Sequence, residues 1–311
     1  MFRKIVRWHP PLMFFVLSMV ALIPVTAIGI LVDDRELVGS PIWFKPFKFA
    51  ISFALYALTY AWLLTLSTRA RRFGWWLGTV IAVSSWFEMA VIVGQVIRGR
   101  QSHFNVSTPL DSALYIAMGI GVVVLWSASA LAALLLAFSK LPDRAAASAI
   151  RFGLLASFVG MTAGFLMLLP SPDQLPAAPN GLLGGHAVGA PEDARSMLVT
   201  GWSLTGGDLR VPHFLGLHGL QVLPLVAMAL ALVIHGERLR RNLVRVAGVG
   251  YGGLVLLTAW QALRGQPLLA PDERTLAALA VLATSCGLAA ALVPAITATA
   301  RALRSRKLKA A

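Results

Sequence analysis

Apolar segments of about 20 residues recur along the whole chain, and this feature limits the fold more than any other. A helix needs about 20 mostly apolar residues to cross a bilayer, whereas a membrane barrel strand needs about 10 residues of alternating polarity. The segments are continuous, so they predict membrane-spanning helices. We place these spans at about 11–32, 47–67, 75–97, 112–138, 148–170, 212–234, 246–263 and 275–299.

The composition agrees with this interpretation. The chain is 58% hydrophobic and only 13% charged, whereas a soluble domain carries roughly 25% charged residues. We therefore predict an all-α integral membrane protein with about eight transmembrane helices, whose surface is covered by the lipid bilayer.

The charges are distributed unevenly between the two sides of the predicted membrane. Of the 27 lysines and arginines, 18 lie before span one, after span eight and around every second gap between them, together with two acids, Asp143 and Glu237. The opposite side carries nine basic and ten acidic residues. Because basic loops stay in the cytoplasm, both termini are predicted to be cytoplasmic. The net charge of +14 is then a topology signal, and no nucleic-acid partner is expected.

The chain also contains an internal repeat. One constant, gap-free shift superimposes spans two and three on spans six and seven, and the most specific match is a Gln-x-x-Arg-Gly motif. Chance is the alternative explanation. The repeat predicts two four-helix halves of the same orientation, at 1–145 and 146–311. The matched pairs are Pro46 with Pro212, Arg72 with Arg238, Gln95 with Gln261, Arg98 with Arg264 and Gly99 with Gly265.

A loop of roughly 40 residues at 171–211 distinguishes the second half from the first, whose equivalent loop at 33–46 has about 14. Loops longer than about 15 residues are usually functional or disordered. The Pro/Gly-rich first part is expected to be irregular. The second part, 194–210, is expected to form a short interfacial helix or lid, with Gly206 and Gly207 as its hinge. A loop that only covers the surface is the other interpretation.

Glu88 is the clearest candidate for a functional residue. It lies about nine residues inside span three, which is roughly 13 Å from the membrane surface at 1.5 Å per residue. Ionisable groups at that depth are costly and are functional candidates by default. Gln95 shares its helix face. Glu88 is expected to carry protons or to contact a ligand, unless it is a protonated side chain bonded to a neighbouring helix.

Span six begins with the densest polar cluster, GDLRVPHFLGLHGLQ. Asp208 and Arg210 are expected at the membrane surface, and His218 is expected near the depth of Glu88. Glu88 and His218, paired where the two halves meet, could relay protons. A hydrogen-bonded structural histidine is the alternative. His213 lies five residues before His218, so the two do not share a helix face as a metal pair would.

Basic residues collect around the outer ends of the same spans. Snorkelling to the membrane surface explains Lys45 and Lys48, and an anion-attracting rim is the alternative. His103 lies in a neighbouring loop and is a weaker candidate. The rim would consist of Lys45, Lys48, Arg98, Arg100, Arg210 and Arg264.

The segments GDLRVPHFLGLHGLQ, KPFKF and QVIRGRQSHFN together resemble bacterial polytopic membrane proteins of uncharacterised activity. The resemblance implies a bacterial cytoplasmic (inner) membrane and supplies no activity. The four-plus-four plan is also similar to that of heme A synthase, in architecture only. Span two carries Phe47 and Ser52 where span six carries His213 and His218, so the paired heme histidines of that family are missing.

Three functional hypotheses follow. In the leading one, spans two, three, six and seven enclose an externally open polar cavity for proton-coupled transport of a small anionic or amphipathic molecule. Glu88 and His218 would carry protons, and the ligand would meet Gln95, Arg98, Asp208, Arg210, His213, Gln221, Gln261 and Arg264.

The first alternative is a membrane oxidoreductase in which His213 and His218, with Glu88 or His103, hold heme or a metal ion. The other is a structural or assembly protein. No catalytic motif such as HExxH, GxSxG or CxxC decides between enzyme and transporter. Neither a cofactor nor a substrate is identified, and homo-oligomerisation stays open.

Overall fold

A computed structural model describes residues 5–309 except 69, 140, 142, 171–173 and 175–180. Eight helices of the described residues are long and apolar enough to cross a membrane, by length and composition. They confirm the prediction of an all-α polytopic membrane protein. The helices are α2 (Pro10–Val32), α3 (Phe44–Thr65), α4 (Arg71–Ile97), α5 (Pro109–Ala137), α6 (Arg144–Gly164, continued by the 3-10 turn η1, Phe165–Leu168), α7 (Arg210–Val233), α8 (Glu237–Leu263) and α9 (Glu273–Lys309).

Some helices begin earlier than the hydropathy pattern predicts. The largest difference is in α8, which starts at Glu237 instead of residue 246. Its first turns carry Arg238, Arg240 and Arg241. Arginine is a good helix former, so the helix continues into a segment that is too polar to be counted as a span.

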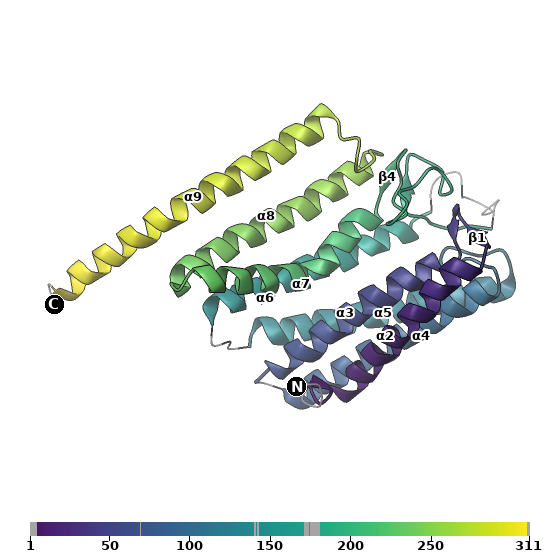
Figure 1. The fold of residues 1–311 in the computed structure, drawn as a ribbon, viewed down its shortest axis with the longest axis horizontal. Coiled ribbons are helices and arrows are strands. Elements are labelled where there is room, and N and C mark those ends of the chain that lie inside the picture. Colours follow the sequence, from purple (N-terminus) through teal and green to yellow (C-terminus); the bar gives the residue numbers. More distant parts are fainter. Residues whose placement is uncertain are drawn as a thin grey trace.

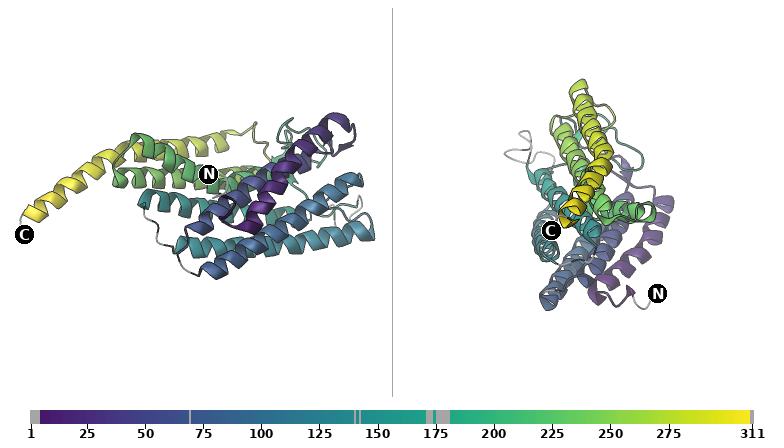
Figure 2. Two further views of the ribbon diagram at one scale, coloured as in Figure 1. Left: turned by 60° about the horizontal axis from the view of Figure 1, so that its bottom comes forward. Right: turned by 90° about the vertical axis from the view of Figure 1, so that its left-hand side faces the viewer.

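The helices form two groups with the same packing order (Figure 1). In the first group α2 packs on α3 and α4, and α4 packs on α3 and α5. In the second group α6 packs on α7 and α8, and α8 packs on α7 and α9. The groups meet through α5 with α6 and, more sparsely, through α3 with α7. As Figure 2 also shows, α9 lies at the outer edge of the second group, beside α8.

Two of these helix pairs keep the register of the sequence repeat. The shift that places Gln95 on Gln261 also places the start of α3 on the start of α7, and both ends of α4 on both ends of α8. A two-stranded antiparallel sheet precedes each of α3 and α7. These sheets are β1 (Glu36–Leu37) with β2 (Ser40–Pro41), and β3 (Ala187–Val188) with β4 (Gly207–Asp208).

The two Gln-x-x-Arg-Gly motifs form matching helix ends. Gly99 and Gly265 have φ angles of +70° and +72°, the left-handed conformation that commonly ends a helix. The next amide donates back to the carbonyl of Gln95 (2.8 Å) or Gln261 (3.2 Å). Each glutamine Nε2 also donates to a carbonyl six residues ahead. The motif therefore stops α4 and α8 in the same way.

The tightest helix contact joins α6 to α7. A Cβ atom at Gly160 would lie 2.6 Å from the Cα of Gly216, and one at Gly216 would lie 2.4 Å from the Cα of Gly160. The two backbones are in direct contact, which only small residues permit. This contact fixes α7, and with it the polar residues of its first turns, against α6.

Residues 194–209 of the long loop form no helix, contrary to one of our expectations. The chain reverses there through the bridge between Ser196 and Ser203 and through Gly201, whose φ is +69°. Gly207 packs so closely on α8 that a Cβ there would overlap the carbonyl of Ala262. Gly201 therefore permits a turn, and Gly207 permits a close contact with α8. The predicted irregular first part of the loop falls largely on residues outside those described.

Candidate functional site

Charged side chains gather at the end of the bundle that carries the long loop, where α3 and α7 begin. Lys45 and Lys48 lie in the first turns of α3, and Arg210 is the first residue of α7. Both helices have a proline in the first turn, Pro46 and Pro212, where the missing N–H costs no helical bond. We call Lys45, Lys48 and Arg210 the cationic cluster. Each lies within electrostatic reach of the others.

Lys45 contacts a histidine of the α4–α5 loop. Its Nζ lies 3.1 Å from Nδ1 of His103, and Ser102 Oγ lies 3.1 Å from the same nitrogen. Burial lowers the pKa of His103 well below its usual value, and the positive charges of Lys45, His186 and His213 lower it further. The imidazole is therefore neutral near pH 7, and its Nδ1 lies within hydrogen-bond distance of the Lys45 side-chain nitrogen.

Lys48 and Arg210 connect the two helices to the long loop. Lys48 Nζ donates to the carbonyl of Thr200 (2.8 Å), and Arg210 donates to the carbonyl of Gly201 and to the carboxylate of Asp208 (2.6 Å). Burial opposes ionisation of Asp208, but the hydrogen bonds from Arg210 hold its pKa below the usual value. The carboxylate of Asp208 therefore forms an ion pair with Arg210. Among the described residues, neither lysine has a carboxylate within ion-pair distance.

Glu88 lies below this cluster, inside the bundle. It is 3% exposed, and its Oε1 has no hydrogen-bond partner among the described residues. A Cβ at Gly121 of α5 would lie 2.7 Å from that oxygen, so a side chain there would displace the carboxyl group. Lys45 is the charged side chain that acts on Glu88 electrostatically. Lys45 therefore links a buried carboxyl group to the histidine of the loop.

The two histidines of α7 have other neighbours. His213 Nδ1 lies 2.8 Å from the carbonyl of Gly160 in α6. The His218 ring packs on Phe214, with 4.3 Å between ring centroids. One turn further along α7, Gln221 donates to Thr59 of α3 (3.0 Å). The described residues show no contact between His218 and Glu88, so the pairing expected for these two residues is not among the contacts of the structure.

Four further candidate residues make contacts at the ends of α4 and α8: Gln95, Arg98, Gln261 and Arg264. Arg98 Nη1 donates to Asp111 (2.9 Å), whose side chain is fully buried, and Gln95 donates to the same carboxylate (3.0 Å). In the second half, Arg264 pairs with Asp272 at the start of α9, and Gln261 donates to backbone carbonyls. The hydrogen bonds from Arg264 lower the pKa of Asp272. These side chains connect consecutive helices.

Sequence reasoning gave no role to His186, which lies beside the site. Its ring packs on Phe104 (5.8 Å), and its Nδ1 lies against the carboxylate of Glu192. Burial lowers the pKa of His186. Glu192 also accepts from two backbone amides, at 2.6 and 2.7 Å. No sequence signal marks this pair, because both residues lie in an irregular loop far along the chain from Phe104.

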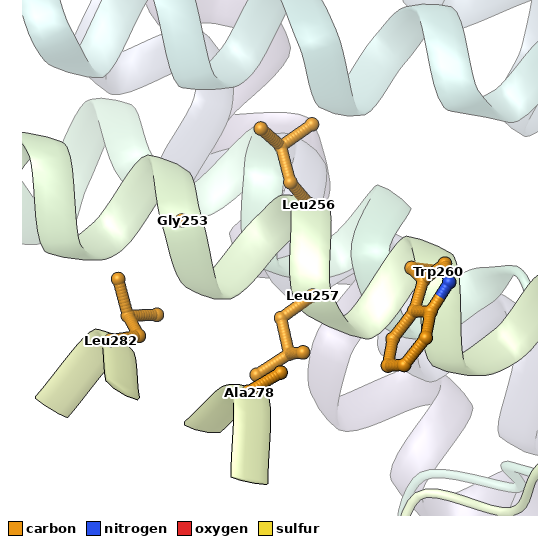
Figure 3. Close-up of a pocket in the computed structure, with 6 residues that line it drawn as sticks. All are labelled: Gly253, Leu256, Leu257, Trp260, Ala278 and Leu282. Atoms are coloured by element: carbon orange, nitrogen blue, oxygen red, sulfur yellow. The ribbon is translucent and has the colours of Figure 1, made fainter. Parts of the chain in front are cut away.

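A groove of about 390 Å³ lies between α8 and α9. Helix α8 corresponds to span seven, one of the four spans that we expected to enclose a polar cavity, whereas α9 is outside that set. Its lining is apolar, as Figure 3 shows, with Leu257 and Trp260 on one side and Ala278 and Leu282 on the other. A group of three or more His, Cys, Asp or Glu side chains that could hold a metal ion is absent from the described residues.

Comparisons with protein-family models, curated proteins and solved structures found no match to this chain.

Proposed function

We propose that this membrane protein binds a small anion at the cationic cluster and moves it across a bacterial inner membrane together with protons. The observation that carries the proposal is that Lys45 contacts the loop histidine His103 and also acts electrostatically on the buried carboxyl group of Glu88. An anion held by Lys45 would lie close enough to Glu88 to change its protonation.

The topology on which the proposal rests places the long-loop end outside and both termini in the cytoplasm. The excess of basic residues at the opposite end supports this orientation. The proposal also includes descent from two tandem repeats, 1–145 and 146–311. The shared register of the helix bounds, the matching helix ends and the common packing order support that duplication.

The charges of the site explain how binding of an anion and protonation of Glu88 become coupled. The proposal takes Lys45, Lys48 and Arg210 as positive, Asp208 as negative and His103 as neutral. The site therefore carries a net charge of +2 when Glu88 is protonated and +1 when it is ionised. An anion binds the protonated form more tightly, and by reciprocity a bound anion favours uptake of a proton. Release of the anion then favours release of the proton.

The test uses the purified full chain in lipid vesicles with a trapped pH indicator. Phosphate, sulfate, acetate and citrate are added outside as separate probes, and we expect at least one to enter with protons and acidify the vesicle interior. Lys45→Gln should abolish the effect of that anion. Glu88→Gln should keep anion binding, measured as thermal stabilisation, and lose the proton movement. Arg274→Gln, which changes an exposed arginine at the same end of the bundle, is the matched control.

The proposal fails if none of the four anions moves protons or stabilises the protein. It fails also if Lys45→Gln and Arg274→Gln behave alike. The heme or metal alternative would use His213 and His218, whose contacts are with Gly160 and Phe214. No observation favours it or the assembly alternative over anion binding.

A further inference from the structure

The tip of the long loop exposes two apolar side chains on a hydrogen-bonded turn. The chain reverses between Met197 and Trp202, where the Met197 amide donates to the carbonyl of Trp202 (2.8 Å) and the Gly201 amide donates to the carbonyl of Met197 (2.9 Å). At the outside of this turn Leu198 is 93% exposed and Val199 is 72% exposed. Exposed apolar pairs on a rigid turn are costly in water unless something covers them.

The turn is attached to the starts of two candidate membrane spans. Lys48, one turn inside α3, donates to the carbonyl of Thr200, and Arg210, the first residue of α7, donates to the carbonyl of Gly201. A Cβ at Gly201 would lie 3.2 Å from Lys48 Nζ and 3.9 Å from Arg210 Nη1. The tip is therefore held at the level where α3 and α7 leave the membrane, rather than high above the bundle.

Aromatic rings surround the same level. Trp202 packs edge-on against Phe214 of α7, with 5.6 Å between centroids, and Phe44 lies 4.5 Å from Lys48 Nζ. Aromatic side chains concentrate at the boundary between hydrocarbon and headgroups. Lys48, which has no carboxylate within ion-pair distance among the described residues, adds a positive charge that complements the phosphate groups of that boundary. This combination of apolar, aromatic and cationic side chains fits a lipid surface.

We infer that residues 197–202 form an anchor in the outer lipid leaflet. Leu198 and Val199 enter the boundary between headgroups and acyl chains, while Lys48 and Arg210 hold the turn at that depth. Interfacial binding of this kind depends on buried apolar area together with attraction to anionic lipid. The anchor fixes the long loop at two places, its base at β4 and its tip in the lipid, above the cationic cluster.

The test places a fluorescent label at the tip. In a Cys286→Ala background, which removes the single native cysteine, Val199→Cys is labelled with an environment-sensitive dye. The protein is reconstituted in vesicles of phosphatidylethanolamine and phosphatidylglycerol. We expect blue-shifted emission, strong quenching by lipids that carry a nitroxide near the glycerol, and weak quenching by aqueous iodide.

Asp193→Cys is the matched control because Asp193 is an exposed polar residue of the same loop. Its label should be quenched several-fold more by iodide than by lipid. Equal iodide quenching at positions 199 and 193 would overturn the inference, and so would a label at 199 that is shielded from both quenchers, which would indicate a protein partner. Leu198→Cys repeats the measurement if Val199→Cys does not fold.

Discussion

The two halves match each other at their helix ends and differ from each other in their interiors. In the register that places Gln95 on Gln261, the helix-ending residues coincide and adopt the same conformation. The residues of the candidate site do not coincide, because Glu88 is matched by Leu254, Lys45 by Val211 and His103 by Leu269. In the other direction Phe44 stands where the second half has Arg210. The candidate site therefore has no counterpart in this register, and its residues come from both halves.

The residues that end the helices and the residues of the candidate site are therefore under separate constraints. A left-handed glycine at a helix end is required wherever the chain turns in that way, so both halves need it. A buried carboxyl group is costly in each place where it occurs. In the proposed site one carboxyl group, on which Lys45 acts electrostatically, is sufficient.

The strongest test gives Glu88 the residue of the other half. Glu88→Leu should leave the fold intact, because a leucine already occupies the equivalent position of α8. Loss of a proton-transferring group typically costs about 100-fold in rate, and we expect a loss of that size in anion-driven acidification of the vesicles. Unchanged proton movement would show that the site works without the carboxyl group.

The next prediction compares the two arginines of the repeated motif. Arg98→Ala removes the ion-pair partner of Asp111, whose side chain is fully buried, and should lower the free energy of unfolding by about 2 kcal/mol. Arg264→Ala should cost less, because Asp272 is 34% exposed and water replaces the lost contact. Denaturation in detergent, with and without added salt, measures both changes. Equal losses would contradict the difference in burial.

Acid should loosen the long loop. The pKa values of His103 and His186 are lowered from 6.5 in the folded protein, so the fold favours their neutral forms. Their effect on stability is absent above pH 6.5 and becomes destabilising as the pH falls below it. Each histidine contributes at most about tenfold per pH unit to loop opening.

Proteolysis of 183–209 at a series of pH values measures this opening. His103→Asn should make the pH dependence shallower, and His235→Asn, at the opposite end of the bundle, should not. A cleavage rate that does not change between pH 7.5 and 5 would contradict the prediction.

The smallest expected effect tests the similarity of the halves. Gly99→Ala and Gly265→Ala each place a Cβ on a left-handed residue, at a cost of about 1 kcal/mol. An added Cβ would make only ordinary van der Waals contacts at both glycines, with no atom closer than 3.4 Å. The two losses in thermal stability should therefore be equal. A large difference would show that the two helix ends are alike in conformation but not in energy.

The helices could be predicted from sequence because span length is set by the bilayer, whatever lies beside each helix. Their starts could be predicted less well, as α8 shows, because a helix continues where hydropathy falls. The burial of Glu88 was also predictable. Its neighbour was not, because Lys45 lies on another helix and the relative rotation and depth of two helices depend on packing that one sequence does not specify.

Packing that one sequence does not specify also explains two other differences between the predictions and the structure. Gln95 and Gln261 were interpreted as ligand contacts, but an amide side chain near a helix end can equally bond the chain that follows, as both do here. His218 was expected beside Glu88 because the two residues lie at similar depths. Depth alone does not decide which neighbour a side chain faces.

The glycine contact between α6 and α7 has a mechanical consequence. Two helices whose backbones touch at Gly160 and Gly216 cannot slide or rotate past each other without a clash. The α3–α7 boundary is sparse, with the hydrogen bond from Gln221 to Thr59 crossing it. Since Lys45 and Arg210 stand on opposite sides of that boundary, any rocking of one half against the other would pull the cationic cluster apart, and the α6–α7 pair would serve as its rigid lever.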